Sequence, residues 1–180
     1  MRARNADPMC SFGDFAAVSD IVDVSTAMTF KTEVCDGLIA PGFEPAALEI
    51  LKAKKKGGFI VLQADEGFIA PLIEFREIFG VAFSQRRNDT IFARTHLQNI
   101  VVGSTLPESA QRDLIVASIA IKYTQSNSVG YARNGQMVGV GAGQQSRVDC
   151  VKLAGRKVEC IYECLMDECN NYSCCIEYIE

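Results

Sequence analysis

The feature that most constrains the fold of this 180-residue chain is the glycine-rich stretch from Asn134 to Arg147. Asn-Gly between two apolar runs is the strongest short-range signal for a β-hairpin. The sequence therefore predicts paired strands over Val129–Arg133 and Gln136–Val140, with Asn134-Gly135 as the turn. From Val148 onward, apolar residues recur at helical spacing. We expect a hairpin whose second strand leads through a turn into a helix.

The segment between this strand and this helix has the chemistry of a small-anion site. Its closely spaced glycines are Gly139, Gly141 and Gly143. Glycines allow bare backbone to approach a ligand, and the first turn of a helix offers unpaired N–H groups. Arg147 adds a permanent positive charge whose planar fork suits phosphate or carboxylate. A dinucleotide fingerprint is disfavoured, because its third glycine would fall on Gln144.

Strand and helix signals alternate along the rest of the chain, which predicts an α/β architecture. Strands are expected over Gly37–Ala40, Phe59–Leu62, Val81–Ser84 and Asn99–Val102. Helices are expected over Glu44–Lys55, Leu72–Phe79 and Pro107–Ile121. The lysine run Lys54–Lys56 closes the first of these helices ahead of Gly57, and we interpret it as a solvated helix end.

Composition and charge argue against several classes of protein. A net charge of −4 and an isoelectric point near 5.1 give no support for a nucleic-acid surface. The longest apolar stretch, Leu114–Ile121, is too short to span a bilayer. The basic start, Met1–Arg4, is not followed by the apolar segment of a secretory signal. We therefore expect a soluble, cytosolic protein of one domain, or one piece of a larger domain.

The cysteines are unevenly distributed, and five of the eight fall in the last 21 residues. They are Cys160, Cys164, Cys169, Cys174 and Cys175. Their spacing lacks paired zinc knuckles, and no histidine lies nearby in the sequence. Disulfides would need an oxidising compartment, which nothing else in the sequence implies. We expect neither a metal site nor disulfides here, and we place a seam in the sequence near Val158-Glu159.

His96 is the only histidine, and it lies in a polar connector without a nucleophile or carboxylate at a recognisable spacing. We expect a surface histidine. The sequence also lacks the short motifs of serine hydrolases, zinc proteases and P-loop proteins. Composition and spacing alone therefore stop at an α/β domain with a small-anion pocket.

Several motifs, in a consistent order along the chain, resemble the transformylase region of a known enzyme family. They are Ser11–Phe15, Ser19-Asp20, Asp36–Gly42, Leu106–Leu114, Lys122–Ser128, Asn134–Gln136 and Gly141–Arg147. The family is the bifunctional AICAR transformylase/IMP cyclohydrolase of purine biosynthesis, and the resemblance is closest to its animal forms. It covers about Arg2 to Val158, which is most of the chain.

The resemblance implies a function and a set of contacts. In this family the transformylase moves a formyl group from 10-formyltetrahydrofolate onto the amine of the nucleotide AICAR, and a separate N-terminal domain closes the product to IMP. The transformylase has two cytidine-deaminase-like α/β lobes without the deaminase zinc, and its sites form across a homodimer. The positions that match nucleotide contacts are Gly13, Asp36, Asn127 and Arg147, and Val148 matches a folate contact.

The sequence also departs from the family pattern. Family catalysis uses an adjacent Lys-His pair from a region upstream of the matching motifs, with the histidine as the base and the lysine stabilising the developing charge on the formyl oxygen. No Lys-His dipeptide occurs here. We expect residues 1–158 to be a partial transformylase domain, and residues 159–180 to be an unrelated cysteine-rich tail, disordered or a splice or gene-model artefact. The alternative function is a non-catalytic fragment that at most binds nucleotide or pairs with the full-length enzyme.

Overall fold

The structure is a computed structural model that describes residues 3–7 and 11–166. Its contacts divide the chain into two compact units, which are described one at a time. Phe12–Thr90 forms the first, called here the parallel-sheet unit. Met1–Ser11 and Ile91–Glu180 belong to the second, called the hairpin unit. The expected α/β class is confirmed, although the strands of the described residues form three separate sheets.

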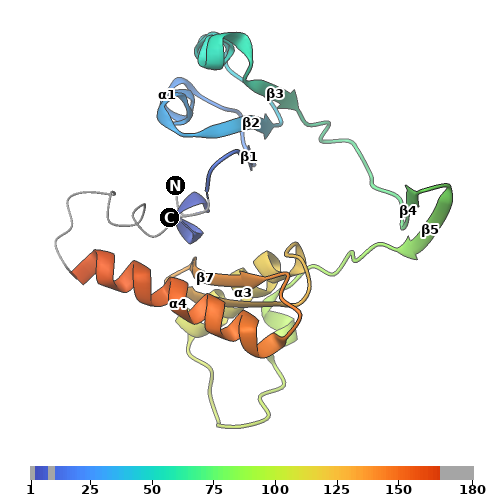
Figure 1. The fold of residues 1–180 in the computed structure, drawn as a ribbon, viewed down its shortest axis with the longest axis vertical. Helices are drawn as coiled ribbons and strands as arrows, with labels where there is room; N and C mark the ends of the chain where they lie inside the picture. The colour runs from blue at the N-terminus through green and yellow to red at the C-terminus, as the bar shows by residue number, and fades with distance from the viewer. Residues whose placement is uncertain (1–2, 8–10, 167–180) are drawn as a thin grey trace. The chain divides into compact units, whose positions relative to one another are not determined.

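Three parallel strands form the sheet of the parallel-sheet unit (Figure 1). They are β1 (Asp14–Ala17), β2 (Cys35–Ala40) and β3 (Ile60–Gln63), in that spatial order. The crossovers that parallel strands require are α1 (Val24–Thr32), then α2 (Pro45–Lys52) with the short 3-10 helix η2 (Lys54–Gly57). The expected strands at Gly37–Ala40 and Phe59–Leu62 are confirmed as β2 and β3, whereas β1 and α1 had not been expected.

Local sequence explains where α1 and α2 begin. The Asp23 carboxylate accepts a hydrogen bond from the Thr26 N–H at 2.7 Å and caps α1. This bond holds the pKa of Asp23 below its ordinary value. Pro45 lies in the first turn of α2, where an N–H would have no helical partner. The core that the two helices share with the sheet consists of Val22, Ala27, Cys35, Leu38, Ala40, Ala47, Leu51 and Phe59.

The helix expected over Glu44–Lys55 is shorter in the structure, because α2 ends at Lys52. Lys55 and Lys56 adopt φ angles of +50° and +53°, in the left-handed region that a continuing α-helix cannot use. The chain therefore turns sharply before Gly57 instead of completing another helical turn.

The segment expected as a weak helix, Leu72–Phe79, is a strand. β4 (Ile73–Ile78) pairs in antiparallel register with β5 (Val81–Arg86), which confirms the strand expected at Val81–Ser84. Apolar residues three apart suggested a helix. The tight turn Phe79-Gly80, with positive φ at both residues, instead gives the strand a partner.

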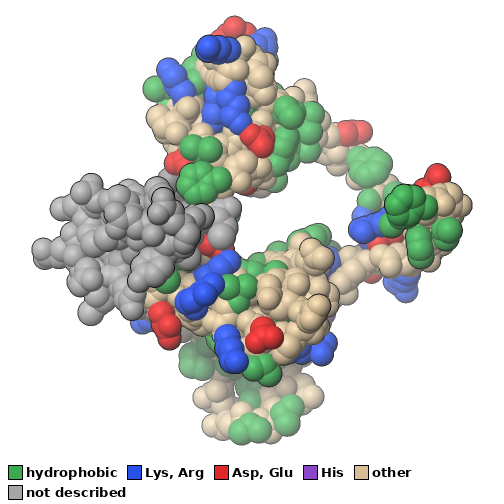
Figure 2. All heavy atoms as spheres, in the orientation of Figure 1, with side chains coloured by type: hydrophobic (Ala, Val, Ile, Leu, Met, Phe, Trp, Pro, Cys, Tyr) green, Lys and Arg blue, Asp and Glu red, His purple; other side chains and the backbone are tan. Residues whose placement is uncertain are grey.

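Apolar side chains of the β4–β5 hairpin remain exposed (Figure 2). They include Phe75, at 71% exposure, and Phe79 at the turn, which is fully exposed. Contiguous apolar surface of this kind favours association with other molecules.

The hairpin unit is built around the expected Asn-Gly hairpin. β6 (Ser128–Arg133) and β7 (Gln136–Ala142) are antiparallel, and Asn134 and Gly135 both have positive φ, as a type I′ turn requires. α3 (Glu108–Lys122) and α4 (Arg147–Met166) lie on opposite faces of this ribbon, with α4 in front of it in Figure 1. The hairpin, the helix expected at Pro107–Ile121 and the helix after the glycines are confirmed.

Two of the glycines in β7 bring the strand against α4. A Cβ on Gly139 would lie 2.4 Å from the Ala154 carbonyl oxygen, and one on Gly141 would lie 2.1 Å from that of Cys150. Both distances are shorter than any van der Waals contact. These two positions therefore face the helix backbone and are not available to a ligand.

The strand expected at Asn99–Val102 does not form. Val101 and Val102 are 86% and 89% exposed, and no strand pairs with them in the described part of the chain. The preceding residues form the short 3-10 helix η3 (Arg94–Leu97). His96 is exposed there, so the expected surface histidine is confirmed.

α4 continues without a break through the expected seam at Val158-Glu159 and reaches Met166. Near the other end of the chain, η1 (Arg4–Ala6) contacts β7, and the half-buried Asp7 forms an ion pair with Lys157 of α4. Cys169, Cys174 and Cys175 of the expected tail lie outside the described residues. Of the described helices, none is long and apolar enough to cross a membrane.

A glycine pair tests the contact between β7 and α4. Gly141→Ala is expected to lower the free energy of unfolding by about 1–3 kcal/mol, because its methyl group would overlap the α4 backbone. Gly155→Ala, within α4 and with open space around it, should raise the free energy of unfolding by about 0.5–1 kcal/mol. Urea unfolding of both variants checks this. Equal effects at the two positions would contradict the close approach.

A carboxylate on α3 fixes the turn of the hairpin. Asp113 accepts hydrogen bonds from the N–H groups of Gly135 at 2.6 Å and Asn134 at 3.0 Å. These bonds, together with the nearby Arg112 guanidinium, hold the pKa of Asp113 below its ordinary value of 3.8. The turn residues thus depend on an ionised side chain from another element.

The effect of this carboxylate on stability should depend on pH. Because the pKa is lower in the folded chain, Asp113 stabilises the fold above its ordinary value of 3.8, and this contribution disappears as pH falls through the folded pKa. Asp113→Ala should therefore lower the melting temperature at pH 7, and by less in acid. Thermal unfolding between pH 7 and pH 2, with Glu159→Ala as the control, measures the difference. If the difference in melting temperature between Asp113→Ala and the unmodified chain stays constant with pH, the ionised Asp113 carboxylate does not stabilise the turn.

Candidate functional site

The parallel-sheet unit brings two of the expected contact residues together. β1 and β2 pair with a register shift, since Asp14 lies opposite Cys35 whereas Phe15 lies opposite Gly37. Asp36 is therefore the extra residue of a β-bulge, which leaves it outside the regular ladder. Gly13, at φ +67°, precedes β1, and a Cβ built on it would lie 3.4 Å from Asp36 Oδ2. We call this the Gly13–Asp36 corner.

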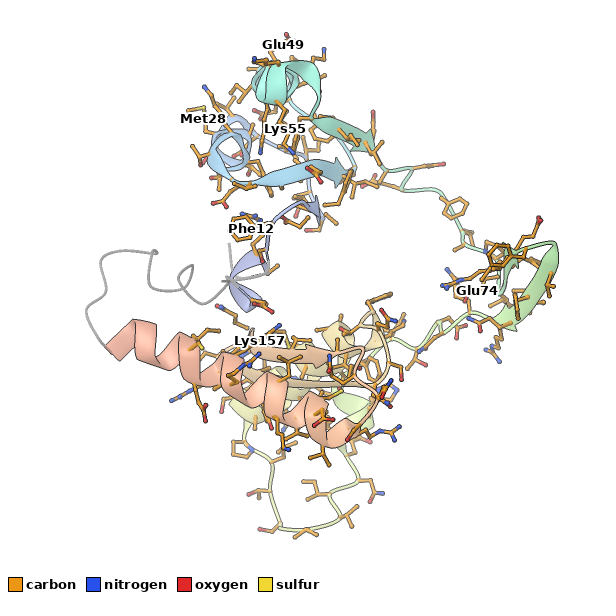
Figure 3. All side chains as sticks on the ribbon, viewed as in Figure 1. Phe12, Met28, Glu49, Lys55, Glu74 and Lys157 are labelled. Carbon is orange, nitrogen blue, oxygen red and sulfur yellow. The ribbon has the colours of Figure 1, made fainter. Side chains whose placement is uncertain are left out.

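A lysine from η2 completes the corner. Lys55, labelled in Figure 3, forms an ion pair with Oδ1 of Asp36. Its side chain is 40% exposed and that of Asp36 is 54% exposed, so both groups are open to solvent. The positive φ angles at Lys55 and Lys56 reverse the backbone direction, so the Lys55 side chain reaches back to Asp36 in β2.

The neighbouring lysine has a structural role. Lys54 Nζ donates to the carbonyl oxygens of Phe30 at 2.5 Å and Glu33 at 2.6 Å, at the end of α1. The ammonium also lies 4.6 Å from the centroid of the Phe59 ring. A cation is favourable at this end of a helix. The interpretation of the whole lysine run as a solvated helix end is therefore wrong, because Lys54 caps α1.

The corner lies at the amino ends of the strands, whereas a cavity lies at the carboxyl ends. Gly13 precedes β1, and Asp36 is the second residue of β2. The cavity has a volume of about 540 Å³ and is lined by Pro41, Gln63, Ala64, Asp65, Glu66 and Gly67. Carboxyl ends of parallel strands are the usual place for ligands. The unit thus offers two distinct regions, one at each end of its parallel strands.

The hairpin unit holds the other expected nucleotide contacts. The side-chain amide of Asn127 donates to the carbonyl oxygens of Gln144 at 3.1 Å and Gln145 at 3.3 Å. The backbone carbonyl oxygen of Asn127 accepts hydrogen bonds from the N–H of Gly143 at 2.8 Å and from the buried thiol of Cys150 at 3.1 Å. Asn127 therefore ties together the turn that enters α4. Its Oδ1 atom has no partner among the residues that the structure describes.

The first residues of α4 follow directly from this turn. The Ser146 hydroxyl accepts from the Val148 N–H at 3.2 Å and caps the helix. Arg147 and Val148 are exposed. No described residue forms an ion pair with the Arg147 guanidinium. The turn thus presents a free cation next to an apolar side chain.

The anion pocket expected from the glycines is only partly supported. Gly139 and Gly141 face α4, so Gly143, at φ +66°, is the one glycine of the three that shapes the turn. Asp149 also places a carboxylate in the first turn of the helix, where it opposes binding of an anion. Arg147 is therefore the group on which anion binding would depend.

Some residues of the site could not be found from their own sequence signals. Lys55, Ser146 and Cys150 act through non-local contacts or through a cap that only the structure reveals. Cys35, Cys150 and Cys160 are free thiols. Within the part of the chain whose side chains are described, no cluster of three His, Cys, Asp or Glu residues could hold a metal ion.

The two units are of mixed α/β class, and polar groups lie at a β-bulge in one unit and at the start of a helix in the other. Residues 1–157 match the family model of the AICARFT/IMPCHase bienzyme, so the chain belongs to this family. The resemblance seen in the motifs is thereby confirmed.

Among curated proteins, the chain is similar to the bifunctional purine biosynthesis protein PurH of Cereibacter sphaeroides. The identity is 33% over 157 residues, which is 87% of this chain and 29% of PurH. PurH proteins of two other strains of that species give the same values. The chain thus spans less than a third of the length of these relatives.

The bonds of Asn127 make a prediction about the turn. Asn127→Asp replaces the donor amide with an acceptor facing two carbonyl oxygens, so the free energy of unfolding should fall by about 1 kcal/mol. Asn99→Asp, at an exposed loop position of the same unit, is the matched control for the added charge. Thermal unfolding of the two variants decides the matter, and equal melting temperatures would show that the amide does not hold the turn.

Proposed function

We propose that this chain carries part of the AICAR-binding site of a formyltransferase of purine biosynthesis, with 10-formyltetrahydrofolate as the cosubstrate. Family membership over residues 1–157 supports the proposal. The observation that carries it is the Gly13–Asp36 corner, where a bulge frees a carboxylate beside a glycine that leaves room for a ligand. The Asp36 carboxylate would accept hydrogen bonds from the amide or ribose hydroxyls of the nucleotide.

Two other residues that match nucleotide contacts of the family, Asn127 and Arg147, belong to the hairpin unit. The Asn127 Oδ1 atom is an available acceptor, and the Arg147 guanidinium suits a polar or charged edge of the ligand. Val148, which is 61% exposed, offers apolar surface to the folate. We further propose that the family-related part ends near Val158, that residues 159–180 are distinct from it, and that the protein acts as a cytosolic homodimer.

The second candidate function is a fragment that binds nucleotide without catalysis, or that pairs with a full-length enzyme. It is favoured by the position of the single histidine. His96 follows Thr95, not a lysine, and its Nδ1 atom lies 3.2 Å from the Ala93 N–H within η3. Among the described residues, none of the proposed contact residues bonds to His96. The contacts proposed here therefore include no histidine that could act as the base in formyl transfer to a weakly nucleophilic amine.

Binding of AICAR to the whole chain tests the proposal. Asp36→Asn and Arg147→Ala should each weaken binding about tenfold in isothermal titration calorimetry, because each removes a charge-assisted hydrogen bond. Glu66→Gln removes a carboxylate from the cavity at the carboxyl ends of the strands and should leave binding unchanged. If Glu66→Gln weakens binding and Asp36→Asn does not, the nucleotide binds in the cavity and the proposed contacts are wrong.

Turnover separates the two candidate functions. Loss of a positioned base typically slows such a reaction by about 10²–10⁴-fold. Incubation of the chain with AICAR and 10-formyltetrahydrofolate should therefore release no measurable tetrahydrofolate. Release that disappears in Arg147→Ala would establish that the chain is itself a formyltransferase.

A further inference from the structure

Lys55 lies in a backbone conformation that lysine rarely adopts. It and Lys56 have φ angles of +50° and +53°, and Gly57 follows at +88°. Consecutive non-glycine residues in the left-handed region persist only where surrounding contacts hold them. Contacts with other parts of the unit must therefore hold the backbone of the segment between α2 and β3 in this conformation.

Lys54 provides one such anchor. Its ammonium donates to the Phe30 and Glu33 carbonyl oxygens and approaches the Cys35 sulfur at 3.3 Å. With Lys54 fixed under the end of α1, the reversal at the next two residues places Lys55 beside β2.

The two oxygens of Asp36 are divided between two neighbours. Oδ1 forms the ion pair with Lys55, whereas Oδ2 faces the open side of Gly13, at 3.4 Å from a Cβ built there. The bulge has removed Asp36 from the regular ladder, so the backbone alone does not determine where the carboxylate points. Lys55 is its only described ion-pair partner.

We propose that Lys55 is a positioning residue for Asp36, which holds Oδ1 so that Oδ2 is presented to a ligand at the Gly13 turn. The proposal rests on the proposed function, because it assigns Asp36 to the nucleotide. Lys55 acts through the carboxylate and is not itself assigned a ligand contact. Lys56 has the same charge and nearly the same φ without a described ion pair, which makes it the matched control.

A measurement without ligand tests the positioning by itself. In ¹H–¹⁵N spectra of the full chain, Lys55→Met should shift the amide signals of Gly13, Asp36 and Gly37. Lys56→Met should leave these three signals in place, and Lys55→Arg should restore them. If both methionine variants shift the signals equally, or neither does, Lys55 does not position Asp36. An unchanged far-ultraviolet circular dichroism spectrum shows that the variants are folded.

A double-mutant cycle with AICAR then separates positioning from direct contact. Exposed ion pairs are weak, so Lys55→Met should raise the Kd for AICAR about fivefold, and Lys56→Met should not change it. In an Asp36→Asn background, Lys55→Met should have no further effect. A full fivefold effect in that background would overturn the proposal, since Lys55 would then contact the ligand. If the unmodified chain does not bind AICAR but the amide shifts occur as expected, the proposed function fails and the positioning stands.

Discussion

The close approach of α4 to β7 is the contact on which the hairpin unit depends. Gly139 and Gly141 carry no side chain, so the helix backbone lies directly against the strand. This contact fixes where α4 starts, and with it the turn that Asn127 bonds and Ser146 caps. The polar groups of this unit are thus placed by a packing constraint, not by bonds to a ligand. Any larger residue at either glycine would move the helix and the turn together.

Much of the fold follows from local sequence, and the errors have identifiable causes. The Asn134-Gly135 turn and α3 carry strong local signals, and the structure has both. Leu72–Phe79 was misassigned because its apolar residues fit helical spacing, while the pairing that makes it a strand comes from β5. Asn99–Val102 has strand-forming residues but no neighbour to pair with among the described strands. Local propensity mispredicts both segments, because strand formation depends on a pairing partner elsewhere in the chain.

The site shows a similar limit. Composition and spacing pointed to glycines and to Arg147, yet two of the three glycines serve packing. Asp36 and Gly13 came from the family resemblance, and the bulge that joins them is a matter of strand register, which a single sequence does not reveal. Lys55 lies 19 residues from Asp36 in the chain. Its role depends on a rare backbone conformation that its neighbours impose.

Two cysteines that are fully buried in the described part of the chain can report on its local opening. Cys150 of α4 is fully buried where this helix packs against β7, and Cys35 is fully buried in the core of the other unit. A buried thiol reacts with a disulfide reagent only while its surroundings are open, so its labelling rate reports the local opening equilibrium. One reporter lies in each unit. Their two rates would show whether the units open together or independently, without any introduced probe.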